Sequence, residues 1–270
     1  GHCVKEVAMS VLRRNNVTVS GQGPRVMVFA HGFGCDQNMW RFVAPAFERS
    51  YRTVLFDHVG AGGSDLAAYD RNRYGTLEGY ADDVLEICRE LRLERAVFVG
   101  HSVSAMVGVL AAIKEPERFD KLVLIGPCYI NDGEYAGGFS REDILQLLES
   151  LDDNYLGWSS TMAPVIMGNP DRPELGTELT NSFCRMDPDI AKQFAKVTFL
   201  SDHRADLPKV KTPSLVLQCS NDVIAAEAVG EYVYRRLPHG QLVRLKATGH
   251  CPNLSAPEET VAAMKPFLGC

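Results

Sequence analysis

The sequence predicts an α/β fold in which a mostly parallel sheet is flanked by helices and carries an inserted helical lid. Short runs of β-branched residues alternate with longer segments of helical period, which is typical of a parallel sheet covered on both faces. Residues 126–201 interrupt this alternation and contain no convincing strand. The chain of 270 residues is long enough for one such domain with a sizeable insertion, and its core needs no disulfide.

The alternating part of the chain predicts seven strands and five helices. We expect strands near residues 17–19, 26–30, 53–57, 96–100, 121–125, 214–219 and 241–246. Helices are predicted over residues 37–47, 76–91, 102–114, 225–236 and 257–267. Thr76 is a helix-capping residue type, and Pro257 suits a first helical turn.

The interrupting segment contains four amphipathic stretches, at residues 140–151, 154–167, 174–185 and 188–200. Turn-forming residues separate them, notably residues 168–171 and 187–188. The segment is too long for a single crossover between neighbouring strands, so we expect a four-helix lid. A pair of ordinary crossover helices is the alternative. The predicted core around the sheet then comprises residues 1–125 and 202–270, and the predicted lid comprises residues 126–201.

Composition excludes several classes of protein. The net charge of −6 and the scattered Lys and Arg residues argue against a nucleic-acid partner. Eight cysteines form no CxxC pair in a chain longer than disulfide-dense modules, which favours reduced thiols and a cytoplasmic location. We expect no secretory signal, because charged residues interrupt the N-terminal segment, and no membrane association, because no apolar run approaches about 18 residues.

Residues 100–104 read Gly-His-Ser-Val-Ser and lie between an apolar run and an Ala- and Val-rich helical stretch. This strand, sharp turn and helix are typical of a nucleophile elbow, with Ser102 as the nucleophile. The strained turn requires small residues two positions before and after the nucleophile, and Gly100 and Ser104 meet that need. The usual pattern has glycine at both positions, and the serine at 104 is a departure that changes no role.

A serine nucleophile needs a base, and the base needs an acid that orients it. In this kind of fold both follow the serine along the chain, in the order acid then histidine, each after a later strand. Asp222 follows the predicted strand 214–219, and His250 follows the strand 241–246. Taken alone, an aspartate in a turn usually shapes the turn, and a histidine after a strand is usually a packing or solvated residue. Together they predict a triad of Ser102, Asp222 and His250, with no metal and no cofactor.

An oxyanion hole requires two backbone N–H groups directed at the attacked carbonyl oxygen. Residues 31–34, His-Gly-Phe-Gly, follow the strand 26–30, which predicts that the amides of Phe33 and Val103 are the two donors. A simple glycine turn is the alternative. A second glycine-rich loop, residues 57–64, lacks the lysine of a phosphate-binding loop, so we predict a structural role for it.

With these motifs in place, the chain resembles the α/β-hydrolase superfamily. More narrowly, it is similar to the subgroup containing the bacterial stress-response regulator RsbQ and the plant strigolactone and karrikin receptors. The stretches that carry the resemblance are residues 31–37, 77–80, 98–106, 137–139, 154–158, 187–190, 199–202 and 249–252. Residues 201–204 and 217–219 resemble the bacterial regulator, whereas residues 103–106 resemble the plant receptors, so the branch stays open.

The resemblance implies a V-shaped cap of four helices over a deep apolar pocket with the triad at its floor. The pocket lining carried over on matching motifs is Phe33, Phe139, Trp158, Met162 and Phe199. Each lid aromatic could instead pack the lid against the sheet. An uncharged pocket lined by aromatic side chains favours a small hydrophobic ester or lactone as the ligand.

Two functions follow from these expectations. The first is a serine hydrolase that cleaves a small hydrophobic ester or lactone through an acyl-enzyme. The alternative is a signalling protein, RsbQ-like or similar to a butenolide receptor, that binds or slowly hydrolyses its ligand and engages a protein partner. Ser102 excludes epoxide or haloalkane chemistry, which needs a carboxylate at the elbow, while perhydrolase and C–C hydrolase activity stay open.

Two cysteines adjoin the predicted site. Cys35 follows the oxyanion loop and Cys251 follows the predicted base. We hypothesise that one of them is solvent-accessible in the pocket and modifiable. Small apolar filling is the alternative role.

Overall fold

The computed structural model describes residues 11–128 and 139–270. Its strands are β1 (Thr18–Gly21), β2 (Arg25–Ala30), β3 (Tyr51–Leu55), β4 (Ala96–His101), β5 (Phe119–Ile125), β6 (Ser214–Ser220) and β7 (Gly240–Thr248). They form one sheet in the order β1-β3-β2-β4-β5-β6-β7, in which β1 is antiparallel to β3 and the other pairs are parallel. The predicted fold class, a mostly parallel sheet flanked by helices, is confirmed.

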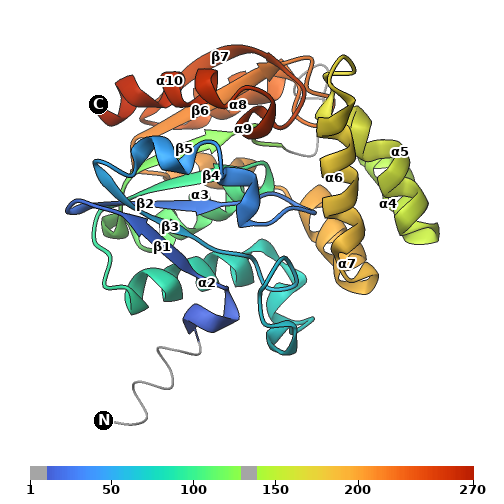
Figure 1. The fold of residues 1–270 in the computed structure, drawn as a ribbon, viewed down its shortest axis with the longest axis horizontal. Coiled ribbons are helices and arrows are strands. Elements are labelled where there is room, and N and C mark those ends of the chain that lie inside the picture. The colour runs from blue at the N-terminus through green and yellow to red at the C-terminus, as the bar shows by residue number, and fades with distance from the viewer. Residues whose placement is uncertain (1–10, 129–138) are drawn as a thin grey trace.

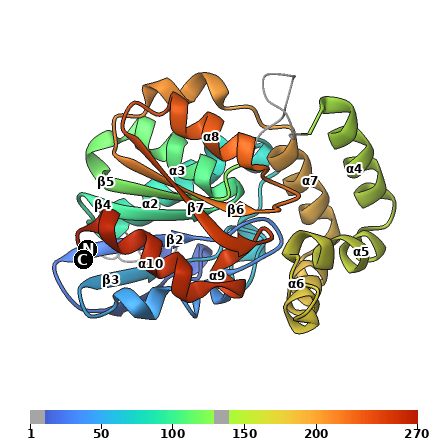
Figure 2. The ribbon, with the colours of Figure 1, turned by 90° about the horizontal axis from the view of Figure 1, so that it is seen from above.

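Helices cover both faces of this sheet (Figures 1 and 2). On one face, α2 (Leu77–Glu90), α3 (Val103–Lys114) and α8 (Glu227–Arg236) pack against side chains such as Val28 and Phe98. On the other face, α10 (Pro257–Leu268) packs against side chains such as Phe29 and Val99. Successive strand residues point to opposite faces, and both faces are buried, so the central strands read as continuous apolar runs.

The predicted helix over residues 37–47 is wrong. The structure has two short 3-10 helices there, η1 (Gln37–Trp40) and η2 (Ala44–Phe47). Pro45 lacks a backbone N–H and its ring crowds the carbonyl four residues earlier, which disfavours one continuous α-helix across this segment. The other described short elements are η3 (Leu66–Ala68), η4 (Arg73–Gly75), η5 (Pro116–Arg118), η6 (Arg204–Lys209) and α9 (Pro252–Ser255).

Four helices stand between β5 and β6, as the sequence predicts. They are α4 (Arg141–Asp153), α5 (Tyr155–Met167), α6 (Pro173–Arg185) and α7 (Pro188–Phe199), and they lie together at one end of the sheet (Figure 1). Side-chain oxygens of Ser140, Asn154 and Asp187 cap the first turns of α4, α5 and α7. Gly137 and Gly138 of the motif at 137–139 lie outside the described residues. The division of the chain into core and lid stays a prediction.

The glycine-rich loop after β3 is organised by one carboxylate. Asp57 accepts hydrogen bonds from Asn16 Nδ2 at 2.9 Å, from the Gln37 amide at 2.8 Å and from the Gly63 amide at 2.9 Å. These hydrogen bonds support the structural role predicted for this loop. Over the described residues, no helix is both long enough and apolar enough to span a bilayer.

Candidate active site

Ser102 occupies a strained turn between β4 and α3. Its backbone has φ 58° and ψ −121°, a conformation that non-glycine residues adopt at a cost and that recurs at functional sites. A Cβ on Gly100 would lie 2.4 Å from the Ser104 carbonyl oxygen, which explains the glycine two residues before the nucleophile. The amide of Ser102 donates to the Ile125 carbonyl at 2.8 Å and so fixes the turn to β5. The elbow geometry expected from residues 100–104 is present.

The structure brings Ser102, His250 and Asp222 into one hydrogen-bonded chain. His250 Nε2 lies 2.8 Å from Ser102 Oγ, and His250 Nδ1 lies 2.8 Å from Asp222 Oδ2. The carboxylate at Nδ1 assigns the proton to that nitrogen, so Nε2 is free to accept from the serine hydroxyl. All three residues are buried, following β4, β6 and β7 at the carboxyl edge of the sheet.

Backbone contacts hold the acid and the base in place. Asp222 Oδ1 accepts from the amides of Ile224 and Ala225, both at 2.9 Å, which leaves Oδ2 for the histidine. The amide of His250 donates to the carbonyl of Ile166, near the end of α5, at 3.0 Å. The loop that carries the base is therefore anchored to one of the four helices above the sheet.

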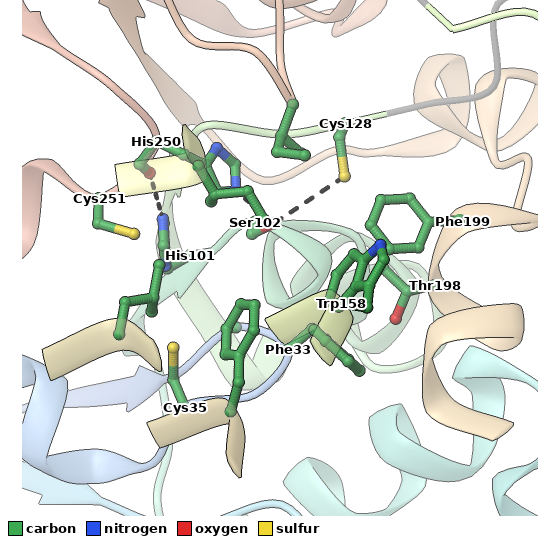
Figure 3. Close-up of a pocket in the computed structure, with 15 residues that line it drawn as sticks. Phe33, Cys35, His101, Ser102, Cys128, Trp158, Thr198, Phe199, His250 and Cys251 are labelled. Carbon is green, nitrogen blue, oxygen red and sulfur yellow. Dashed lines mark hydrogen bonds between the residues drawn. The ribbon is translucent and has the colours of Figure 1, made fainter. Parts of the chain in front are cut away.

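His101 helps to position the loop of His250, a role that the sequence analysis did not assign to it. Its Nε2 lies 2.7 Å from the carbonyl oxygen of His250, and the two rings are 5.0 Å apart (Figure 3). Burial lowers the pKa of His101 to about 3, so the ring is neutral near pH 7 and donates its Nε2–H to that carbonyl. No pattern in the sequence marks this contact, because the partner is a backbone atom 149 positions away.

The serine at position 104 links the elbow to the loop after β2. Its hydroxyl donates to the carbonyl of His31, and His58 Nε2 lies 2.7 Å from the same hydroxyl oxygen. Burial lowers the pKa of His31 and of His58, so both rings stay neutral. Glycine, the usual residue here, could not make this link.

The loop of residues 31–34 lies against the nucleophile. A Cβ on Gly32 would be 3.3 Å from Ser102 Cβ. Val103 is the first residue of α3, where helix N–H groups lack intrahelical partners and carry a partial positive charge. Within the described chain, neither the Phe33 nor the Val103 amide donates to a protein acceptor. Both N–H groups are therefore available for an oxyanion.

A small cavity opens above Ser102 (Figure 3). The cavity has a volume of about 30 Å³, which is enough for roughly two water molecules. Phe33, Trp158 and Phe199 line it, as predicted. Phe139 and Met162 are outside the lining of this cavity and pack, partly buried, against the core. Their predicted contact with substrate stays a prediction.

Sequence reasoning missed Phe183 and Leu179, which project from one face of α6 into the cavity. The Phe183 ring is stacked on Trp158 with centroids 6.0 Å apart and meets Phe33 edge-on at 5.4 Å. The two α6 residues are four apart in an amphipathic stretch, which is a usable signal for a shared face. What the sequence lacks is the direction in which that face points.

The expectation that Cys35 or Cys251 is solvent-accessible is wrong. The two residues are 4% and 1% exposed, and burial raises the pKa of both thiols, so they act as small apolar fillers in the cavity wall. Cys128 lies nearer the nucleophile, with Sγ 3.9 Å from Ser102 Oγ (Figure 3). Burial raises its pKa to about 12, so it too stays a neutral thiol. In the described part of the chain, no group of three His, Cys, Asp or Glu residues is arranged to hold a metal ion.

The sheet topology and the Ser-His-Asp chain together define a hydrolase of the α/β class. A family model described as the alpha/beta hydrolase family matches residues 27–263, and the chain belongs to this family.

Curated relatives match along most of the chain. It is 40% identical over 262 residues to the strigolactone esterase D14 of Arabidopsis thaliana, covering 96% of this chain and 98% of the relative. It is 40% identical over 253 residues to the karrikin insensitive 2 receptor CA of Petunia hybrida, covering 93% and 94%. The resemblance to the plant strigolactone and karrikin receptors is confirmed, whereas the resemblance to the bacterial regulator stays a prediction.

A solved structure matches equally well. The hydrolase olei00960 from Oleispira antarctica superposes with a TM-score of 0.93 at 39% identity, and the alignment covers 97% of both chains. Both the sheet that carries the triad and the four helices α4 to α7 therefore lie within the aligned length.

Proposed function

We propose that this hydrolase cleaves small hydrophobic carboxylic esters or lactones through an acyl-enzyme on Ser102. The observation that carries the proposal is the continuous hydrogen-bond chain from Asp222 through His250 to Ser102, which ends in an apolar cavity. A serine hydroxyl hydrogen-bonded to an imidazole that a carboxylate orients is the arrangement that makes serine nucleophilic. Phe33 and Val103 supply the oxyanion donors in this proposal.

The reaction runs in two halves. Ser102 Oγ attacks the carbonyl carbon while His250 Nε2 takes the hydroxyl proton, and Asp222 stabilises the imidazolium that forms. The amides of Phe33 and Val103 hold the oxyanion, which collapses as His250 gives its proton to the departing alkoxide oxygen. In the second half His250 takes a proton from water, the hydroxide attacks the acyl carbon, and Ser102 leaves with its proton restored.

The cavity limits the substrate class. Its described lining includes no Lys, Arg, Asp or Glu, which disfavours charged acids and phosphoesters. Its volume of about 30 Å³ is far below the 300 Å³ or so of a typical ligand pocket, so the substrate is small and enters by displacing the aromatic side chains above it. Relatives named strigolactone esterase support an ester or lactone as the bond that is cleaved.

A signalling role is the second candidate, favoured by the relatives named karrikin insensitive 2 receptors. In that role the same cavity binds a small lactone-like ligand and the triad cleaves it slowly. A change in the helices above the sheet then engages a protein partner.

The proposal places the chain in the cytoplasm, because the described cysteines are free and stable in a reducing compartment. Because the chain has a net charge of −6, we propose neither a nucleic acid nor a membrane as its partner.

Hydrolysis of p-nitrophenyl butanoate tests the first function. Ser102→Ala is expected to lower kcat by at least about 1,000-fold, because the substitution removes the nucleophile and leaves the fold intact. Ser160→Ala, which removes an exposed serine hydroxyl on α5, is the matched control and should retain full activity. Unchanged hydrolysis by Ser102→Ala, with an unchanged Tm, contradicts the proposal. Very slow turnover by the unaltered protein, with a ligand-induced fall in Tm, favours signalling.

A further inference from the structure

Thr198 lies near the carboxyl end of α7 and lines the cavity on the same side as Phe199 and Trp158 (Figure 3). It is 5% exposed, and no described protein group forms a hydrogen bond with its Oγ1. A buried hydroxyl without a partner is costly, because it has left water without replacing its hydrogen bonds. Of the buried side-chain polar atoms that lack a partner in the described chain, this is the one on the cavity wall.

Local structure offers this hydroxyl an acceptor that it does not use. A Ser or Thr inside a helix commonly donates to the carbonyl oxygen four residues earlier. Hydroxyls elsewhere in the helices of this chain do so: Ser159, Ser160, Thr177, Thr180 and Thr260. Thr198 has the carbonyl of Phe194 at the equivalent position and makes no such bond. Its hydroxyl is therefore without a partner in the described chain, on a residue that lines the cavity.

The surroundings of Thr198 indicate that its hydroxyl is placed to orient a ligand. The neighbouring wall is apolar, formed by Phe33, Trp158, Phe183 and Phe199. Pockets of this type orient their ligands through a few polar groups set in an apolar wall. The triad and the two amides serve the carbonyl under attack, so a polar group on the α7 wall serves a different part of the ligand.

We propose that Thr198 is a specificity-determining residue that donates a hydrogen bond to a second oxygen of the substrate, distinct from the carbonyl attacked by Ser102. This inference rests on the proposed ester or lactone hydrolysis. It narrows the substrate to a small apolar ester or lactone that carries one further acceptor, such as an ether or carbonyl oxygen. Thr198→Val removes the donor at constant shape, and Thr198→Ser keeps it.

An oxygen scan of matched substrates tests the inference. The acyl side is covered by p-nitrophenyl hexanoate and its analogues in which an ether oxygen replaces the third, fourth or fifth carbon. The alcohol side is covered by hexyl butanoate and its corresponding ether analogues. For at least one ether analogue, Thr198→Val is expected to lower kcat/KM about tenfold, because the ether loses its donor. The carbon parents should change by less than about twofold, and Thr198→Ser should restore the preference.

The two possible failures give different results. If Thr198→Val affects every ether analogue and its parent equally, the role of Thr198 is overturned while Ser102-dependent hydrolysis stands. If no compound is hydrolysed in a Ser102-dependent way, the proposed function fails. The Thr198 contact is then decided by calorimetric binding of the same compounds to Ser102→Ala, with and without Thr198→Val. If Ser102→Ala and the double variant with Thr198→Val bind every compound with equal affinity, the contact is rejected. If Thr198→Val lowers the affinity for an ether analogue alone, the contact is supported.

Discussion

At the scale of single residues, Gly34 joins the loop beside the nucleophile to helix α6. Its φ is +74°, and a Cβ there would lie 2.2 Å from Cδ1 of Phe183. Its carbonyl oxygen also accepts a hydrogen bond from Ser182 Oγ at 2.5 Å. One glycine therefore satisfies a left-handed backbone and a close ring contact at once. Phe33 is the preceding residue, so we expect a backbone shift at Gly34 to displace Phe33 as well.

Gly34→Ala is expected to lower stability by about 1–3 kcal/mol, because alanine is strained at positive φ and collides with the ring. The displaced Phe33 amide should also lower kcat about tenfold or more, with a smaller effect on KM. Urea unfolding and ester hydrolysis measure the two effects. Gly75→Ala is the matched control, because nothing lies within 4 Å of its added Cβ. Equal behaviour of the two variants contradicts this account of Gly34.

The sequence identifies residues whose chemistry depends on neighbours close in the chain. The elbow around Ser102 is visible because its steric need for small residues is met within five positions. The contact of His101 with the His250 carbonyl could not be found this way, because its partner is distant in the chain. The role that we propose for Thr198 could not be found either, because it depends on how α7 packs against the cavity. The departure at Ser104 was noticed, but its partners His31 and His58 belong to two other loops.

At the scale of elements, the parallel strands are the most predictable part of the chain. The central strands are buried on both faces and read as continuous apolar runs. The strands β1 and β7 are largely exposed or half-buried, yet all seven strands were placed from the sequence to within a few residues. The helix predicted over residues 37–47 was wrong because its apolar spacing matches a helix, whereas Pro45 disfavours a continuous one. The four helices between β5 and β6 were predicted from their amphipathic spacing and the turn residues between them, both of which are local signals.

The contact between α6 and η1 yields a prediction at this scale. The Arg41 guanidinium pairs with both carboxylate oxygens of Glu178, at 2.7 and 2.8 Å, and the two side chains are 34% and 28% exposed. A double-mutant cycle with Arg41→Ala and Glu178→Ala is expected to give a coupling free energy of about 0.5–1 kcal/mol, because the geometry is bidentate but solvent screens the pair.

The pair Arg235–Glu231 provides the comparison for that cycle. It lies within α8 at a spacing of four residues, and its side chains are 70% and 37% exposed. Its coupling should be lower, about 0.3–0.5 kcal/mol. Both couplings are measured by urea unfolding and should shrink in 1 M salt, where exposed charges are screened. A coupling above about 2 kcal/mol for Arg41–Glu178 that salt leaves unchanged would mean that solvent does not reach the pair.

At the scale of the whole molecule, the sheet determines which distant residues meet. Parallel strands end at the same edge, so the loops after β2, β4, β6 and β7 converge there, and the chain order of serine, acid and histidine sufficed to predict the triad. The cavity lining was less predictable, because it depends on how α5, α6 and α7 seat on that edge. Three predicted lining residues are in the wall, whereas Phe139 and Met162 are not, and Phe183 was missed.

Global stability should depend on pH through the buried histidines. Burial lowers the pKa of His31, His58 and His101, to about 3 for His101, while the unfolded chain binds these protons near pH 6.5. Between those two values the unfolded state binds more protons than the folded state, so stability rises with pH and is lost on acidification below about pH 6.5. Each such histidine contributes up to about 1.4 kcal/mol per pH unit in that window.

Urea unfolding at pH 7.5, 6.5 and 5.5 measures this dependence. His58→Gln should reduce the slope by roughly one histidine's share, because one buried proton acceptor is removed. His239→Gln, at an exposed site, should leave the slope unchanged. The assignment is wrong if both variants keep the slope of the unaltered chain, or if stability increases on acidification below pH 6.5.

The hydrogen bond from the His250 amide to Ile166, at 3.0 Å, has a consequence for timing. Asn169, just past the end of α5, also donates to the Thr248 carbonyl at 3.0 Å. The loop that carries His250 is therefore tied to the carboxyl end of α5 by two hydrogen bonds. We expect a ligand that pushes the carboxyl end of α5 outward to shift the His250 imidazole as well, because these backbone contacts join the two. Residence of a bound molecule and the speed of its cleavage are thus mechanically linked, and a single helix end can tune one against the other.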